Sequence, residues 1–454
     1  MNQNNSLINN MTEGPLFRQL VRFSIPIIVG NLLQTCYTIA DMIIVGNFIG
    51  SDGLAAVGIG GLIQNLILSF AMGMGFGGQI LLSQQVGAGE SERLKKSIGT
   101  FMTLSMGAAV ILTATGFAAD DWLLRVLNTP EAILTQTKAY NLICYGGLFF
   151  IYGYNCVCSV LRGLGQSRLP MVFIAIASVV NIVLDIVFID VFGMNVEGAA
   201  LATVIAQGIS YIISIVYLAI RREAFAFDFK PRSFIPDRRA VAVIMKLSLP
   251  IIIYGLMMNF SSMFINSNVN VYGVAASAVD SVGTKLNMAV NAVTMGLYMG
   301  SASVIGQCFG AGKIDRIRKT FWLTILMSIV VWAMIAGVLL AFTGKIFGLF
   351  TDDAEVLAIA PRYVLISVLM FFGMALVTGP FALFEGIGNT TLEMIAGIFE
   401  GLVMKVALSL LFSSLIGLYG YWLGTALAAF TTPVIGITYF LRGRWIERKV
   451  VMDV

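Results

Sequence analysis

The sequence feature that most constrains the fold is a series of apolar runs, each long enough to cross a lipid bilayer. Twelve runs of about 20 residues or more alternate with short polar links. Charged residues make up only 11% of the 454 residues, against about 25% in soluble domains. A soluble protein could not bury this much apolar surface, so the sequence predicts an all-α integral membrane protein with twelve transmembrane helices. The expected spans are residues 19–47, 53–82, 96–118, 137–161, 169–190, 198–220, 242–270, 275–305, 320–344, 361–384, 394–416 and 420–441.

An internal repeat divides these runs into two sets of six. Residues 84–96, which begin Gln-Gln-Val-Gly-Ala-Gly, recur at 307–319 as Gln-Cys-Phe-Gly-Ala-Gly, and residues 161–171 recur at 384–394 with the same shift of 223 positions. Six is an even number, so both copies start from the same side of the membrane. We therefore expect two pseudo-symmetric six-helix lobes related by an axis along the membrane normal. The expected domains are an amino-terminal lobe at 1–220, a cytoplasmic linker at 221–241 and a carboxy-terminal lobe at 242–454.

The distribution of basic residues predicts the orientation. If the amino terminus is cytoplasmic, the inner segments hold 22 of the 28 Lys and Arg residues, and the outer links hold four. The remaining two, Lys285 and Lys405, fall within spans. Because cytoplasmic loops are enriched in Lys and Arg, we expect a multi-pass protein with both termini in the cytoplasm.

Two acidic residues of the first half, Asp41 and Asp185, fall well inside predicted spans. A carboxylate at that depth costs roughly 2.5–3.5 kcal/mol on insertion scales, so such residues usually face a wet cavity. Asn181 is four residues before Asp185 and shares its helix face. Two carboxyl groups at similar depth predict a shared proton or one hard cation ringed by oxygens, and Asn155, Asn181 and Thr203 could supply further oxygens. The alternative is that each acid is hydrogen-bonded for packing alone.

The first span carries a proline and a polar stripe. Pro26 removes a backbone hydrogen bond and predicts a bend, which is either a static kink or a hinge. Gln34, Tyr37 and Asp41 are spaced i, i+3, i+7 and share one face. A polar stripe this deep in a span is expected to face a cavity rather than lipid.

The second half mixes acids and bases within its spans. Asp280 and Lys285 are five residues apart, as are Glu400 and Lys405, which is awkward for a pair within one helix. A pair between helices is geometrically easier. Such a polar network is often only structural because it neutralises itself, and the alternative is a role in ion coupling.

Catalytic and cofactor motifs are missing from the sequence. The chain has no histidine, so proton handling near neutral pH falls to carboxyl groups. The two Gly-Ala-Gly segments lack the Lys-Ser/Thr of a phosphate-binding loop, and no nucleotide, haem or metal-ligand pattern is present. We expect a protein that is not an enzyme, needs no cofactor and binds no nucleic acid.

Six motifs occur in order along this duplicated chain. They are Phe-Ser-Ile-Pro at 23–26, Ile-Ala-Asp-Met-Ile-Ile-Val-Gly at 39–46, the repeated Gln-x-x-Gly-Ala-Gly, Leu-Arg-Gly-Leu-Gly-Gln-Ser-Arg at 161–168, Asn181-x-x-x-Asp185 and Gly-Ala-Ala-Leu-Ala-Thr at 198–203. With these motifs, the chain resembles the multidrug and toxic compound extrusion (MATE) transporters over essentially its whole length. Within the family it is most similar to the DinF-like branch and its MepA-type relatives.

The resemblance implies a MATE/MOP-type fold and efflux of organic cations driven by inward Na+ and/or H+ across a bacterial or archaeal cytoplasmic membrane. We expect small-molecule drugs and the bilayer as partners, and a monomer. The acidic site of the branch, where Na+ or a proton would bind, matches Asp41, Asn181, Asp185 and Thr203. The residues expected to line the substrate cavity are Gln34, Tyr37, Tyr140 and Asn155, and Pro26 matches the bending proline.

One departure from the family bears on ion coupling. The NorM-type branch has acids on its seventh and tenth spans, whereas residues 242–270 and 361–384 contain none. We therefore expect coupling to depend on the first lobe. The alternative function is a flippase of a lipid-linked or amphipathic substrate from the same superfamily. Only Lys285 and Lys405 are basic residues expected to be buried within spans, against several buried acids, so the balance of buried charge favours cationic cargo.

Overall fold

The computed structural model describes residues 8–225 and 227–451, and these residues are helical with no β-strand among them. Twelve helical spans within the described residues are long and apolar enough to cross a membrane, and each overlaps one of the twelve predicted spans. The predicted all-α, twelve-span membrane fold is therefore confirmed. The largest difference is in the third span, which begins at Ser91 and continues to Val126, because the helix runs on past both predicted ends.

The first six spans are single helices except for the fifth, which ends in a π-helical segment. They are α1 (Leu16–Phe48), α2 (Ser51–Ala88), α3 (Ser91–Val126), α4 (Glu131–Gly163), α5 (Arg168–Asp185) with η2 (Ile186–Val191), and α6 (Val196–Ile220). The linker then forms two short helices, α7 (Arg222–Phe225) and η3 (Pro231–Phe234).

Interruptions are more frequent in the last six spans. These are α8 (Arg238–Asn270), α9 (Val274–Gly310), α10 (Ile314–Gly348), α11 (Ala354–Leu376) with α12 (Thr378–Gly386), α13 (Thr390–Ile398) with η4 (Phe399–Met404) and α14 (Lys405–Ile416), and α15 (Leu418–Ala428) with α16 (Thr431–Leu441). Each half thus has a π-helical segment in its fifth span. Such segments are rare and frequently lie at functional sites.

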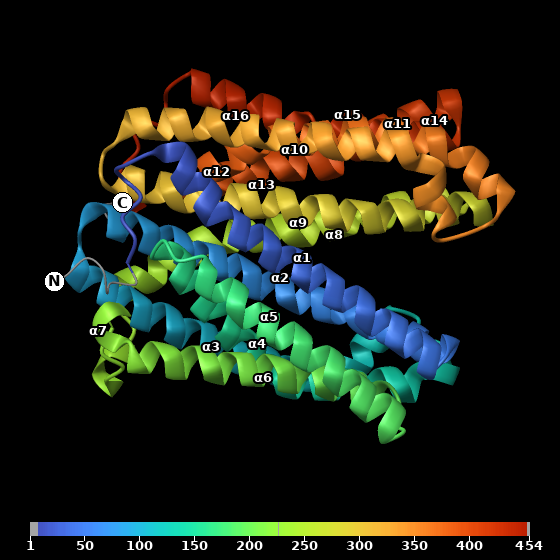
Figure 1. Cartoon of the computed structure of the whole chain (residues 1–454), viewed down its shortest axis with the longest axis horizontal. Coiled ribbons are helices and arrows are strands. Elements are labelled where there is room, and N and C mark those ends of the chain that lie inside the picture. Colours follow the sequence, from blue (N-terminus) through green and yellow to red (C-terminus); the bar gives the residue numbers. More distant parts are fainter. Residues whose placement is uncertain (1–7, 226, 452–454) are drawn as a thin grey trace. The chain divides into compact units, whose positions relative to one another are not determined.

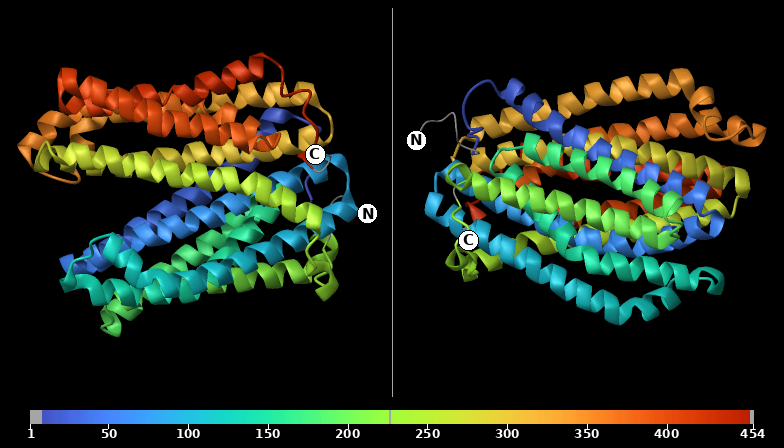
Figure 2. Two further views of the ribbon diagram at one scale, coloured as in Figure 1. Left: turned by 180° about the vertical axis from the view of Figure 1, so that it is seen from behind. Right: turned by 60° about the horizontal axis from the view of Figure 1, so that its bottom comes forward.

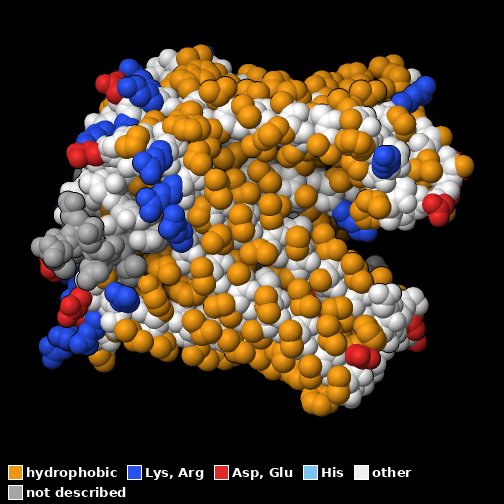
Figure 3. Space-filling view, in the orientation of Figure 1, with side chains coloured by type: hydrophobic (Ala, Val, Ile, Leu, Met, Phe, Trp, Pro, Cys, Tyr) orange, Lys and Arg blue, Asp and Glu red, His pale blue; other side chains and the backbone are white. Residues whose placement is uncertain are grey.

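The lateral surface is suited to lipid. On the face in Figure 3, hydrophobic side chains cover the middle of the helices and most charged side chains lie near the helix ends. In α10, Leu326, Val330, Met334 and Val338 are each more than half exposed and follow one another at intervals of four residues. This spacing makes one apolar stripe along the helix.

The described residues form two compact units. Unit 1 comprises the described parts of Met1–Asn10 and Val29–Ser248, and unit 2 comprises Met11–Ile28 with the described part of Leu249–Val454. Helices α1 and α8 therefore each contribute to both units. In contrast to a division at the linker, residues 11–28 and 242–248 pack with the other half of the chain.

Close contacts hold each of these segments in the unit formed mainly by the other half of the chain. In unit 2, Gly300 of α9 lies so close to Ser24 of α1 that a Cβ atom there would collide with the serine. In unit 1, Gly77 of α2 lies equally close to Ser248 of α8. The two Ser–Gly pairs occupy equivalent positions in the sequence repeat. Arg316 also donates hydrogen bonds to the carbonyl oxygens of residues 11 and 14, at 3.0 and 2.9 Å.

Helix α4 is the centre of unit 1. It packs against α2, α3 and α6, and more lightly against α5, and these helices run alongside one another in Figures 1 and 2. Its membrane-spanning part is two-thirds buried, the largest share among the twelve spans. Helix α5 packs on α6, so the acid-bearing end of α5 is held within this bundle.

Candidate functional site

Asp41 and Asp185 lie together inside unit 1. Asp41 is on α1, Asp185 is the last residue of α5, and their carboxyl groups are close enough to hydrogen-bond when one is protonated. Asp185 is fully buried, and apart from Asp41 neither of its carboxylate oxygens has a hydrogen-bond partner among the described residues. Because like charges this close repel, the pair is stable only with a shared proton or a bound cation.

Asn181 extends this site along α5. Its Nδ2 donates to Oγ1 of Thr203 on α6 over 3.4 Å, which is long for a hydrogen bond. Its Oδ1 is buried and has no partner within the described part of the chain. Since buried polar atoms are normally hydrogen-bonded, the orphaned oxygens of Asn181 and Asp185 on one helix face are an arrangement suited to a cation.

Tyr37 connects α1 with α6. Its hydroxyl interacts with the side chains of Gln34, Thr38 and Gln207, and Gln34 itself is exposed. Gln207 is buried and lies one helical turn after Thr203. Sequence reasoning did not select Gln207, although its i+4 spacing from Thr203 was the signal that could have found it.

Helix α4 contributes Tyr140 but keeps Asn155 apart from it. Tyr140 is buried beside Cys144, within electrostatic reach of Asp41 and Tyr37. Asn155 lies fifteen residues further along α4, about 22 Å at 1.5 Å per residue. Its Nδ2 donates to the Ile151 carbonyl of its own helix at 2.8 Å. Of the four residues expected in the substrate cavity, Tyr37 and Tyr140 are thus near the acids, and Asn155 is held elsewhere.

Pro26 lies within α1, two residues before the helix passes from unit 2 to unit 1 between Ile28 and Val29. Pro250 has the equivalent place in α8, where the crossing lies between Ser248 and Leu249. Both prolines weaken the backbone hydrogen bonding of a helix at the point where it changes unit.

Of the four polar residues predicted in the second half, Asp280, Glu400 and Lys405 interact electrostatically and Lys285 lies apart from them. Asp280 Oδ1 accepts a hydrogen bond from the indole of Trp422 at 2.9 Å, and Asp280 and Lys405 line the same cavity in unit 2. Glu400 lies in η4 and accepts a hydrogen bond from the backbone of Thr432 at 3.1 Å. Lys285 instead stands over the ring of Phe350 at 5.3 Å. Among the described residues, no two of the four form an ion pair within 4 Å.

The structure also reveals buried acids that sequence reasoning passed over. Asp120 Oδ1 accepts hydrogen bonds from Asn141 and Tyr145, each at 2.9 Å. It escaped notice because the third span was expected to stop at residue 118. In unit 2, the eleventh span begins at Thr390 and so includes the buried Glu393. Glu385, which the sequence already indicated as an acid within the spans of this half, is buried at the end of the tenth span, which continues to Gly386. The second half is therefore less poor in acid than its predicted seventh and tenth spans indicated.

The unit 1 site is suited to a proton or to a small cation that oxygen atoms bind. It offers two carboxyl groups, an amide oxygen and a hydroxyl. Within the described residues, no group of three or more His, Cys, Asp and Glu side chains is arranged to hold a metal ion. Protonation or cation binding would neutralise the pair, and removal of that ion would leave negative charge available to another cation.

Comparisons with known proteins agree with the repeat and the fold. The MatE family model matches residues 26–187 and 250–411, the corresponding parts of the two halves. The probable multidrug resistance protein YpnP of Bacillus subtilis is 29% identical over 446 residues, covering 98% of this chain and 99% of its own. The multidrug export protein MepA of Staphylococcus haemolyticus is 25% identical over 445 residues, covering 95% of each chain. An outward-facing multidrug resistance MATE family transporter of the MOP superfamily superposes with a TM-score of 0.91 at 25% identity, covering 97% of this chain and 98% of that one.

Proposed function

Because the chain belongs to the MatE family of membrane transporters, we propose that it is a multidrug efflux transporter that exports organic cations in exchange for inward Na+ or H+. The resemblance to MATE transporters and to their MepA-type relatives is confirmed, and members of this family are transporters rather than enzymes. Relatives covering nearly the whole chain are named as multidrug resistance or export proteins, which supports drugs as the cargo.

The observation that carries the proposal is the pair of facing carboxyl groups of Asp41 and Asp185. Asp185 has no other hydrogen-bond partner among the described residues. A buried carboxylate left in this way must be neutralised by a proton or a cation. An organic cation and an inorganic ion can then compete for one negative charge.

This competition gives the transport cycle. Na+ or H+ arriving from outside neutralises Asp41 and Asp185, which releases the bound organic cation and lets α1 bend near Pro26. The ion leaves on the cytoplasmic side, and the recharged acids attract the next drug. Exchange follows because each cation lowers the affinity for the other, which is a differential-affinity mechanism.

The orientation belongs to the same proposal. Both termini face the cytoplasm of a bacterial or archaeal cell, and the two six-helix lobes act as the moving bodies. The concentration of Lys and Arg in the expected inner segments supports this orientation.

The test is ethidium transport by the purified protein in sealed liposomes, with an imposed Na+ gradient and an imposed pH gradient applied separately. We expect at least one gradient to drive ethidium against its concentration, and the driving gradient identifies the coupling ion. Protein-free liposomes and liposomes without a gradient are the controls. Ethidium movement that both gradients leave unchanged would refute ion-coupled export.

A further inference from the structure

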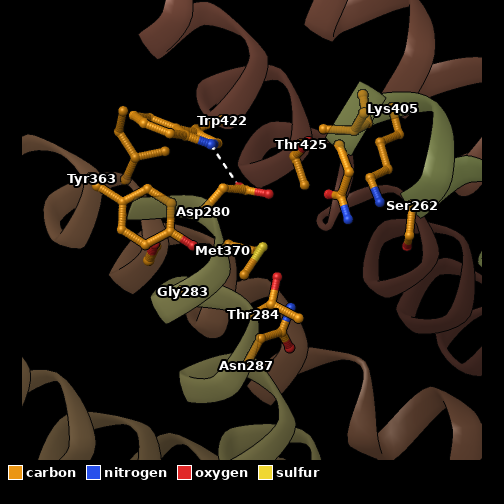
Figure 4. A pocket seen from close by; sticks show the side chains of 14 residues that line it. Ser262, Asp280, Gly283, Thr284, Asn287, Tyr363, Met370, Lys405, Trp422 and Thr425 are labelled. Carbon is orange, nitrogen blue, oxygen red and sulfur yellow. Dashed lines mark hydrogen bonds between the residues drawn. The ribbon is translucent and has the colours of Figure 1, made fainter. Parts of the chain in front are cut away.

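Unit 2 encloses a polar cavity that the proposed function does not use. Its volume is about 150 Å³, about ten times the ~15 Å³ that one buried water needs. Helices α8, α9, α11, α14 and α15 line it, and Figure 4 shows their side chains converging on one space. The cavity therefore has room for a small organic molecule.

One end of the cavity is suited to a positively charged group. Asp280 on α9 is fixed by the hydrogen bond from Trp422, which occupies only one of its carboxylate oxygens. In Figure 4 the other oxygen points away from Trp422 toward Thr425. The rings of Tyr363 and Trp422 pack edge to face at 4.7 Å beside it. A carboxylate beside two aromatic rings is an arrangement that binds organic ammonium groups.

This end depends on a close approach between two helices. Tyr363 on α11 lies against Gly283 on α9, and a Cβ atom at position 283 would overlap the tyrosine hydroxyl. Gly283 is one helical turn beyond Asp280 and also lines the cavity. The missing side chain lets the tyrosine lie beside the carboxylate.

The other end carries a positive charge. Lys405 on α14 extends into the cavity on the side of Ser262, across from Asp280 (Figure 4). Among the described residues its ammonium group has no ion pair within 4 Å. Glu400 and Asp280 both attract it without a direct contact, and one oxygen of the Glu400 carboxylate already accepts the hydrogen bond from Thr432. The ammonium group is therefore available to an anionic group in the cavity.

The two opposite charges line one space without touching. Separated charges with few partners raise the free energy of the folded protein when they lie in an apolar surrounding. A molecule with complementary charges would contact both the carboxylate of Asp280 and the ammonium group of Lys405. We propose that the unit 2 cavity is a second binding site, for a small zwitterion. Its ammonium group lies against Asp280, Tyr363 and Trp422, and its carboxylate or phosphate lies against Lys405.

The charge pattern favours a zwitterion over the simpler occupants. A cation alone would leave the ammonium group of Lys405 without a contacting anion, and an anion alone would leave the free oxygen of Asp280 without a contacting cation. Such a zwitterion is either a free solute or the headgroup of a phospholipid such as phosphatidylethanolamine. The two sources share the same recognition chemistry, and the bilayer composition separates them.

The test measures binding to the purified full-length protein in a non-ionic maltoside detergent by calorimetry. Glycine betaine is the zwitterionic probe, choline carries only its cationic group, and acetate carries only its anionic group. We expect saturable binding of betaine, at least about tenfold tighter than of choline or acetate, because each of these loses one charge-assisted contact. This comparison uses the unmodified protein and so does not depend on any variant folding.

Variants assign the binding to the cavity. Asp280→Asn and Lys405→Gln should each weaken betaine binding by about tenfold or more. Lys285→Gln is the matched control, since this lysine of the same unit stands over Phe350 outside the cavity. The choline titration is repeated in Asp41→Asn, because the acids of unit 1 are themselves proposed to bind organic cations. A second arm repeats the titration in nanodiscs of phosphatidylglycerol with and without phosphatidylethanolamine. If the natural occupant is a lipid headgroup, phosphatidylethanolamine should compete with betaine and weaken its apparent binding.

Three results would overturn the inference. The first is an absence of saturable betaine binding in detergent and in phosphatidylglycerol nanodiscs. The second is binding of choline to Asp41→Asn, or of acetate to the unmodified protein, as tight as that of betaine, which would indicate a site for one charge only. The third is betaine binding that survives both Asp280→Asn and Lys405→Gln. None of these results would affect the proposal for unit 1, whose test is ethidium transport.

Discussion

The acid pair of unit 1 and the polar cavity of unit 2 differ in the charges that they bring together. Unit 1 brings two carboxyl groups together and places amide and hydroxyl groups beside them. Unit 2 holds a carboxylate and an ammonium group apart across a cavity, with an indole on the carboxylate. The two halves share a six-span plan and a sequence repeat. The helical framework has therefore been kept, whereas the polar side chains inside it have diverged.

This difference shows where function lies in a duplicated membrane protein. The repeated motifs lie at helix ends and at close helix contacts, such as the two Ser–Gly pairs, where they maintain packing. The acids and lysines inside the spans do not follow the repeat. A pair of acids selects cations, whereas an acid and a lysine held apart select a molecule with both charges.

The largest expected effect comes from removing the charge of unit 1. Asp185→Asn and Asp41→Asn should each lower gradient-driven ethidium efflux by about 100-fold or more, because the drug loses its charged partner and the ion loses its ligand. The measurement is efflux from liposomes containing equal amounts of inserted protein.

Two exposed acids serve as matched controls for those variants. Asp190→Asn changes an exposed carboxylate in the same span as Asp185, and Asp52→Asn changes one at the start of α2. Both should keep the unmodified rate. If either Asp185→Asn or Asp41→Asn kept full efflux, that carboxyl group would not be part of the coupling site, and the proposed difference between the units would be wrong.

A smaller effect is expected from filling the helix contact beside the unit 2 cavity. Gly283→Ala should destabilise the protein by about 1–3 kcal/mol, because the new methyl group overlaps the hydroxyl of Tyr363. Thermal unfolding in detergent measures the change. Tyr363→Phe in the same background removes the hydroxyl and should restore part of the stability.

Gly337→Ala is the control for that substitution. Position 337 is also helical and in unit 2, but it has open space around its Cα. Alanine there should be neutral or stabilising by about 0.5–1 kcal/mol. If Gly283→Ala behaved in the same way, the close fit between Tyr363 and α9 would be wrong.

Substituting the two prolines tests whether bending of α1 and bending of α8 contribute equally to transport. Pro26→Ala should slow ethidium turnover several-fold without weakening ethidium binding, because the restored hydrogen bond stiffens α1 on the way to Asp41. Pro250→Ala should slow it less, since α8 carries no acid. Turnover and equilibrium binding measured on the same samples decide this. Equal slowing by both substitutions would mean that the halves contribute alike to the movement.

The smallest effect concerns the linker of unit 1. The hydrogen bonds and charge of Lys95, with the hydroxyl of Ser233, hold the pKa of Asp228 well below its usual value. A carboxylate with a lowered pKa stabilises the fold above its unfolded pKa of about 3.9 and stops doing so as the pH falls below it. Asp228→Asn should therefore lower the melting temperature slightly at neutral pH, and the difference should vanish in acid.

Asp315→Asn is the comparison for Asp228. That carboxylate is almost fully exposed, and its nearest basic group is 3.8 Å away. Its removal should leave the melting temperature unchanged at both pH values. A persistent difference between the Asp228 variant and the unmodified protein in acid would contradict the assigned charge interaction.

Much of the fold followed from the sequence because bilayer thickness and helix rise leave little freedom. All twelve spans were found, and Asp41, Asn181 and Asp185 stood out because polar groups are rare at that depth. Tyr37 lies near Asp41 as helical spacing within α1 predicts, whereas Thr203 joins the group through a contact between α5 and α6.

What the sequence could not show depends on contacts between distant segments. Gln207 reaches Tyr37 only because α6 packs near α1, and Asp120 is buried only because Asn141 and Tyr145 on α4 face it. The hydrogen bond from Asn155 to the carbonyl of Ile151 also does not follow from residue type alone. The assignment of residues 11–28 to unit 2 likewise rests on contacts with α9 and α10, which no local pattern encodes.

That last assignment affects how the chain can be assembled during synthesis. The segment Met11–Ile28 is made first, yet its packing partners Gly300 and Arg316 emerge more than half a chain length later. Until then the start of α1 has only lipid or a chaperone to cover it, and such delayed long-range pairing slows folding. A product truncated after the linker would therefore lack the residues of α9 and α10 against which the start of α1 packs.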